Sequence, residues 1–191
     1  MSILAFAGLI TTGVGMATDN NLVTAIGLTA IAMPAMISGG LAFSLLTPIG
    51  IGVGATTLVA GAGTALFASA EYQETFTGNN WMLSRLGEGL YNGLMITTAT
   101  IATLGTAASS LAYSFNINTI TEIGKIKGSN YKGIKFTQTR NGKPVYRSLE
   151  FHYGHIHKGH KLHWQLNKWS PSGSSLRKGT AWWTIWLKRI P

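Results

Sequence analysis

Two stretches of this chain carry no charged side chain and are long enough to form helices that cross a membrane. Residues 22–70 and residues 89–121 contain no Asp, Glu, Lys or Arg. A membrane-spanning helix needs about 20 mainly apolar residues. We therefore expect two passes in the first stretch, over 21–46 and 49–70, and one in the second, over 90–115. A shorter apolar run over 3–17 precedes them.

After residue 122 the long apolar runs give way to short segments in which apolar and polar residues alternate, which is typical of half-buried strands. Asn141-Gly142 predicts a tight hairpin turn, because both residues tolerate a positive φ. Strands are expected on either side of it, over 134–139 and 145–153, and two more over 162–169 and 181–190. A short helix is expected over 118–127. The predicted fold class is α+β, with apolar helical hairpins followed by a small antiparallel four-stranded sheet.

Charge divides the chain at the same place. Residues 1–122 hold Arg85 and five acids, for a net charge of −4, whereas residues 123–191 hold fourteen Lys and Arg and one acid, Glu150, for +13. So sharp a break marks two modules with different surroundings. We expect residues 1–122 to be a membrane-active helical domain and residues 123–191 to be a basic β-rich domain. The positive-inside rule places the basic domain on the cytoplasmic side.

The apolar segments are rich in Gly, Ala, Thr and Ser, and this composition leaves two interpretations open. Small residues let helices approach closely within a membrane. They also make each helix only marginally hydrophobic, so the helices could stay under a protein cover and insert later. The alternative is a stable helical-hairpin membrane protein. For the small sheet domain, the core is expected from aromatic residues: Phe136, Tyr146, Phe151, Trp164, Trp183 and Trp186.

All the histidines of the chain lie between residues 152 and 163, and Glu150 stands two residues before the first of them. Histidine exchanges protons near neutral pH, and a Glu–His or His–His pair can take the proton of a ribose 2′-OH and protonate the leaving 5′-oxygen. Alternation along a strand places Glu150 and His152 on the same face. We expect Glu150 or His152 to be the base and His157 or His163 the acid.

Two other interpretations of the histidines compete with catalysis. Histidine-rich tracts bind zinc, and a metal site would use His155, His157 and His160. The chain has no cysteine, which excludes thiolate ligands, and it has too few carboxylates near the histidines for magnesium. The third interpretation is a solvated polar loop that binds phosphate weakly.

Basic and aromatic residues are interleaved around the histidines, a pattern typical of surfaces that hold phosphates and stack bases. Anionic lipid beside the helices is the alternative partner of such a basic surface. The residues expected to contact nucleic acid are Arg147, Lys158, Lys161, Trp164, Lys168, Arg177 and Lys178.

The order of an apolar Gly/Ala/Thr-rich region, a segment over 71–128 and a compact basic end with a histidine cluster resembles the C-terminal regions of bacterial polymorphic toxins of the RHS/YD-repeat type. The motifs that carry the resemblance are TGNNW (77–81), YNGLMI (91–96) and AYSFNIN (112–118). The resemblance implies that the last 60–70 residues are an effector delivered to a competitor cell, and that an immunity protein blocks it in the producer. It assigns no catalytic residue.

Together these observations predict a toxin module whose basic domain cleaves RNA by His/Glu acid–base catalysis, with no metal or cofactor. Its partners would be RNA, an immunity protein, a membrane contacted through residues 1–122, and anionic phosphate surfaces. The chain would be associated with a membrane or delivered to a target cell. The alternatives are a membrane-embedded or pore-forming protein with a basic anchor, and a zinc-dependent His-rich nuclease.

Overall fold

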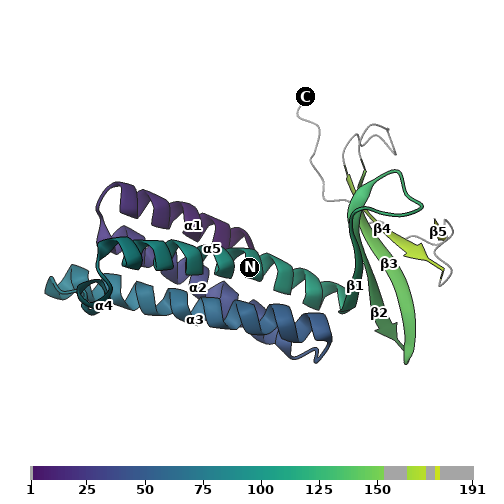
Figure 1. The fold of residues 1–191 in the computed structure, drawn as a ribbon, viewed down its shortest axis with the longest axis horizontal. Coiled ribbons are helices and arrows are strands. Elements are labelled where there is room, and N and C mark those ends of the chain that lie inside the picture. The colour runs from purple at the N-terminus through teal and green to yellow at the C-terminus, as the bar shows by residue number, and fades with distance from the viewer. Residues whose placement is uncertain (1, 153–162, 171–174, 177–191) are drawn as a thin grey trace. The chain divides into compact units, whose positions relative to one another are not determined.

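A computed structural model describes residues 2–152, 163–170 and 175–176 of the chain. The chain forms two compact units that divide between Ser114 and Phe115. The first is helical and the second is an antiparallel sheet, so the predicted α+β class is confirmed (Figure 1). The division lies N-terminal to the charge break at Glu122, which falls inside the first strand.

The helices follow the apolar segments of the sequence. They are α1 (Ser2–Ala17), α2 (Asn21–Phe43), α3 (Pro48–Thr77), the short α4 (Trp81–Leu86) and α5 (Glu88–Phe115). Polar caps fix where two of them begin: Asn20 accepts a hydrogen bond from the Val23 backbone N–H, and Thr47 accepts one from that of Gly50. Among the described residues, α2, α3 and α5 are long and apolar enough to cross a membrane.

Small residues line the contacts between these helices. Gly8 and Gly15 of α1 lie against α2, and Gly54 of α3 lies against the α2 backbone near Gly39. The buried positions of α3 are Gly, Ala and Thr, apart from Phe67 and Glu71. Small side chains let helix backbones approach closely. The abundance of Gly, Ala and Thr therefore allows short distances between these helices.

Large apolar side chains point outward from the same helices. Ile10 of α1, Val59 of α3 and Leu104 of α5 expose 70%, 73% and 58% of their surface. A water-soluble bundle buries such residues in its core. Here Gly, Ala and Thr occupy most of the buried positions of the helical unit, and many Ile, Leu, Val, Met and Phe side chains are exposed on its outside. The large residues in its interior are Leu28, Ile31, Phe67, Tyr91 and Met95.

The threonine hydroxyls of the helices are satisfied within their own helix. Thr12, Thr64 and Thr103 each donate to the carbonyl four residues earlier, at 2.9, 2.8 and 2.8 Å. The Thr57 hydroxyl also pairs with Ser109 of α5 at 2.9 Å. A helix rich in threonine therefore presents few unsatisfied polar groups to an apolar environment.

The sheet consists of β1 (Ile117–Lys125), β2 (Lys132–Arg140), β3 (Lys143–His152), β4 (His163–Trp169) and the two-residue β5 (Ser175–Leu176). The strands lie in sequence order and each is antiparallel to the next. The predicted Asn141-Gly142 turn joins β2 to β3, with φ angles of 52° and 72°. These positive values are those of the tight hairpin turn that the Asn-Gly pair favours.

The predicted helix over 118–127 is wrong, because this segment forms β1. The segment Ile117–Ile123 holds five β-branched residues, which suit a strand better than a helix. The strand expected over 181–190 lies outside the described residues. Of the predicted aromatic core, Phe136 is buried, whereas Tyr146, Phe151 and Trp164 are half-buried. The more deeply buried tryptophan of the described sheet is Trp169.

Candidate active site

Three alternate residues of β3, namely Ser148, Glu150 and His152, form a buried polar row on one face of the sheet. Their side chains are 0%, 1% and 6% exposed. Buried polar groups are costly unless hydrogen-bonded, so a row of three requires partners from neighbouring elements. The structure thus brings Glu150 and His152 together, as their spacing of two along the strand predicts.

The Glu150 carboxylate is the centre of this row. Ser129, from the connection between β1 and β2, donates its hydroxyl to Oε2 at 2.5 Å. Ser148 donates to Oε1, and the Asn167 side chain on β4 donates as well. His152 faces the same carboxylate, with Nε2 3.6 Å from Oε2.

These contacts decide the charge of Glu150. Burial raises the pKa of a carboxyl, but the nearby imidazole of His152 and the hydrogen bonds from Ser129, Ser148 and Asn167 together outweigh it and lower the pKa of Glu150 to about 2. The group is therefore a carboxylate at neutral pH. A general base works best with a pKa near the working pH, so Glu150 is poorly suited to be one. Its charge and position suit it to orient His152.

His152 lies between this carboxylate and an aromatic ring. The ring of Tyr131 stacks on the imidazole at 3.8 Å between centroids and 19° between planes. Tyr131 belongs to the connection between β1 and β2, where its carbonyl accepts a hydrogen bond from Ile126 at 3.3 Å. Because Ser129 and Tyr131 contact Glu150 and His152, this connection lies directly against the polar row.

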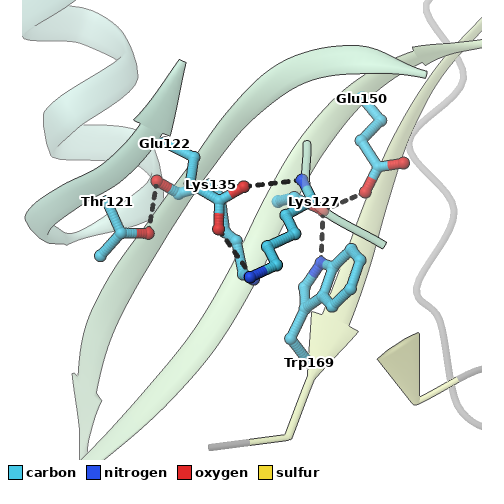
Figure 2. A network of polar contacts seen from close by, with 7 residues as sticks. Thr121, Glu122, Lys127, Lys135, Glu150 and Trp169 are labelled. Carbon is cyan, nitrogen blue, oxygen red and sulfur yellow. Dashed lines mark hydrogen bonds and ion pairs between the residues drawn. The ribbon is translucent and has the colours of Figure 1, made fainter. Parts of the chain in front are cut away.

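A second polar group borders the row (Figure 2). Trp169 Nε1 donates to the Ser148 hydroxyl at 2.7 Å. The Lys135 ammonium lies 4.3 Å from the centre of a Trp169 ring and 3.2 Å from Glu122 Oε1. The pKa of Glu122 is lowered, first by the hydrogen bond from the Lys127 backbone N–H, at 2.8 Å, and also by Lys135.

The sequence prediction did not include Ser129, Tyr131, Lys135, Ser148 or Trp169. Two of them could have been found by the same alternation that joined Glu150 to His152. Ser148 precedes Glu150 by two residues on β3, and Lys135 pairs directly with Ser148 across β2 and β3. No pattern in the sequence indicates that Ser129 and Tyr131 would lie against this face.

The described residues that were predicted to hold phosphate and bases, namely Arg147, Trp164 and Lys168, lie elsewhere on the sheet. Arg147 alternates with Ser148 and Glu150, so its side chain points to the opposite face of β3. Lys168 is directly opposite Arg147 on β4, and Trp164 is opposite Phe151, with ring centroids 5.2 Å apart. These residues therefore lie on the face of the sheet opposite to Glu150 and His152, where Lys168 is exposed and Arg147 and Trp164 are half-buried.

The remaining predicted site residues cannot be placed in the same way. The backbone of His163 pairs with that of His152 between β3 and β4. Within the part of the chain that the structure describes, no group of three or more His, Asp or Glu could hold a metal ion. The other predicted residues lie outside the described residues: His155, His157, Lys158, His160, Lys161, Arg177 and Lys178.

The arrangement provides an imidazole held by a buried carboxylate on a domain of strongly basic composition. A Glu–His pair is one of the arrangements used in general acid–base catalysis. Comparison of the chain with protein-family models, with curated proteins and with solved structures gives no match. The candidate site therefore rests on its geometry alone.

Proposed function

We propose that this chain is a membrane-inserting module of a bacterial toxin, whose helical unit enters a lipid bilayer and whose basic sheet domain is the effector. The observation that carries the proposal is the inverted packing of the helical unit, with Gly, Ala and Thr inside and large apolar residues outside. In lipid, helices associate through small residues, and large apolar side chains face the acyl chains.

The charge pattern supports a defined orientation in the bilayer. The carboxylates of the helical unit gather toward one end of the helices: Asp19 follows α1, Glu74 and the buried Glu71 lie near the end of α3, and Glu88 begins α5. The opposite end of α5 leads into the +13 half of the chain. Positive segments stay on the cytoplasmic side, so the sheet domain would lie there.

Leakage of dye from liposomes tests insertion. The full chain, added to vesicles loaded with a self-quenching dye, is expected to release the dye and to remain bound after a carbonate wash. A matched variant carries Asp at outward-facing Val59, Leu66 and Leu104, where charge is costly in lipid. Release and carbonate-resistant binding by the native chain but not by the variant would support the proposal. Equal behaviour of both would contradict it.

A second function, cleavage of RNA, is favoured by the Glu150–His152 pair. In this mechanism His152 takes the proton from a ribose 2′-OH, and the 2′-oxygen attacks the adjacent phosphorus. The bond from phosphorus to the 5′-oxygen breaks, and His157 or His163 protonates the leaving oxygen, which yields a 2′,3′-cyclic phosphate. No metal takes part in this mechanism.

Incubation of the full chain with RNA and with DNA, each with and without EDTA, tests this function. RNA cleavage that survives EDTA and falls about 10²-fold or more in His152→Ala is the expected result. Alanine at His157 or His163 is expected to have a similar effect if either is the acid. Cleavage that is lost with EDTA would indicate a metal site instead. If neither polymer is cleaved, the proposed RNA cleavage fails and only the membrane function remains.

A further inference from the structure

The connection between β1 and β2, residues 126–131, lies over the polar row of β3. Ser129 donates its hydroxyl to Glu150 Oε2 at 2.5 Å, and the ring of Tyr131 stacks on the imidazole of His152 with 3.8 Å between centroids. His152 is only 6% exposed, and both of its ring nitrogens are buried. A substrate therefore cannot contact this imidazole in the described conformation.

The connection is a compact unit with hydrogen bonds of its own. The backbone N–H of Ser129 donates to the Ile126 carbonyl at 3.0 Å, and that of Ile126 donates to the Tyr131 carbonyl at 3.3 Å. The Tyr131 N–H donates to the Ser129 hydroxyl at 3.2 Å. Because these bonds lie within the connection, they are kept when it moves as one body. The contacts of Ser129 with Glu150 and of Tyr131 with His152 are the ones that such a movement breaks.

A glycine in the left-handed region precedes the connection. Gly124 lies near the end of β1 and has a φ of 96°. Residues with a side chain adopt such a φ only at a cost, whereas glycine moves into and out of this region freely. Hinges of moving segments are loop or element-terminal residues that absorb a change in φ and ψ. Gly124 has the position and the backbone conformation of such a hinge.

We propose that the connection of residues 126–131 is a lid, which closes the Glu150–His152 site in the free chain and opens to admit substrate. The catalytic meaning of the lid rests on the proposed RNA cleavage. Lys127 on the lid and Lys125 and Lys132 beside it are exposed, so the outer surface of the lid is positively charged. The backbone N–H of Lys127 also donates to Glu122 at 2.8 Å (Figure 2). Clustered lysines bind phosphates, so the substrate that the lid admits is a polyanion.

The test is the chemical reactivity of His152, measured on the full chain in detergent micelles. Diethyl pyrocarbonate modifies an imidazole only when a ring nitrogen is accessible, and fragment-ion mass spectrometry assigns the modification to His152. In the native chain His152 is expected to react at least about tenfold more slowly than in urea, since a minor open state is populated at about 10% or less. Equal rates in the native and unfolded chains would overturn the lid.

Gly124→Ala is the variant that opens the lid without removing any of its contacts. A Cβ on Gly124 would meet nothing within 4 Å, so the effect comes from backbone strain alone. This strain is expected to raise the reactivity of His152 about tenfold. The matched control is Gly142→Ala, because Gly142 has a φ of 72° and equal space for a Cβ but lies in the β2–β3 turn. Equal reactivity in the two variants would contradict a hinge at Gly124.

A second pair of variants covers the case in which Gly124→Ala fails to fold, as checked by circular dichroism. Ser129→Ala removes the hydrogen bond from the lid to Glu150 and is expected to raise the reactivity of His152 about tenfold, since this bond goes to a charged group. Asn130→Ala changes the neighbouring exposed residue and is expected to leave the reactivity unchanged. The same rate in both variants would show that Ser129 does not hold the lid closed.

RNA cleavage separates the lid from the proposed function. A closed lid lowers the apparent rate by the fraction of molecules that are open, so Gly124→Ala is expected to cleave RNA faster than the native chain. If the native chain cleaves no RNA but His152 becomes reactive in Gly124→Ala alone, the lid stands and the proposed reaction fails. If RNA is cleaved while His152 reacts equally in Gly124→Ala and Gly142→Ala, the lid fails and the proposed reaction stands.

Discussion

Gly27 of α2 lies against Thr12 of α1 with no room for a side chain between them. A Cβ atom on Gly27 would lie 2.4 Å from the Thr12 backbone nitrogen and 2.5 Å from its Oγ1. The obstacle is backbone as well as side chain, so rotation of Thr12 cannot relieve it. The contact between α1 and α2 therefore depends on the absence of a single methyl group.

Gly27→Ala is expected to destabilise the helical unit, by about 1–3 kcal/mol for an overpacked contact. The same helix offers a control, because a Cβ on Gly40 would meet nothing within 4 Å. Gly40→Ala is expected to be neutral or slightly stabilising, since alanine favours helix more than glycine does. Loss of helical circular dichroism on heating in detergent measures both. Equal melting temperatures for the two variants would show that the helices are not packed as described.

The two ends of α2 are expected on opposite sides of a bilayer. The chain has no cysteine, so single cysteines can be introduced without background. Thr18→Cys lies in the turn before α2 and Ser44→Cys in the turn after it, and both positions are exposed. In sealed inverted vesicles an impermeant maleimide is expected to label Cys at 44, on the cytoplasmic side, and not at 18. Labelling of both, or the reverse pattern, would exclude this topology.

Arg147 and Glu150 are expected to affect RNA cleavage in different ways, because their side chains point to opposite faces of β3. Arg147→Gln removes a cation from the basic face and is expected to raise KM, with little change in kcat. It should also lower the slope of log binding constant against log salt concentration by about one, because one phosphate contact is lost. Glu150→Gln is expected to lower kcat. Steady-state kinetics at several salt concentrations distinguish the two, and a fall in kcat for Arg147→Gln would place both residues in one site.

The sheet domain is expected to lose stability in acid because of Glu150. Its pKa is about 2 in the folded chain, against an ordinary value of 4.5. A carboxyl with a lowered folded pKa stabilises the fold fully above its unfolded pKa and loses that contribution as the pH falls through the folded value. The expected window of loss is therefore from about pH 4.5 down to about pH 2.

Urea unfolding of the chain at several pH values, followed by tryptophan fluorescence, measures this loss. Five of the six tryptophans lie in the C-terminal half, so the signal reports mainly on that half. In Glu150→Gln the decline between these pH values is expected to be smaller than in the native chain. A native midpoint that does not move with pH in this range would be inconsistent with a carboxylate held ionised by its neighbours.

The helices and the hairpin could be predicted from sequence because their signals are local. Freedom from charge over more than twenty residues indicates an apolar helix, and Asn141-Gly142 determines a turn by its own φ preferences. The segment that forms β1 was mistaken for a helix because its apolar residues do not alternate regularly. In the structure β1 nevertheless alternates between more and less buried positions, although its pairing with β2 shifts register between Ile117 and Thr119 and again between Ile120 and Glu122.

The site could be predicted only where it lies along one strand. Glu150 and His152 are neighbours through alternation, and the same rule separates Arg147 from them. Ser129 and Tyr131 reach the site from the connection between β1 and β2, a contact that depends on how the sheet folds on itself. The expected basic surface was inferred from net charge and included all the cations of the domain. Net charge does not indicate on which face of a strand each cation lies.

The inverted packing of the helical unit reverses the usual relation between position and tolerance to substitution. In a water-soluble bundle the outside varies and the large apolar core is constrained. If the helical unit enters a bilayer as proposed, exposed Ile, Leu, Val and Phe are expected to replace one another at little cost, because acyl chains accept them all. The constraint falls on inward glycines such as Gly8, Gly15 and Gly27, where every larger residue meets backbone. Related chains are therefore expected to keep these small residues and to vary at the positions of the exposed large apolar residues.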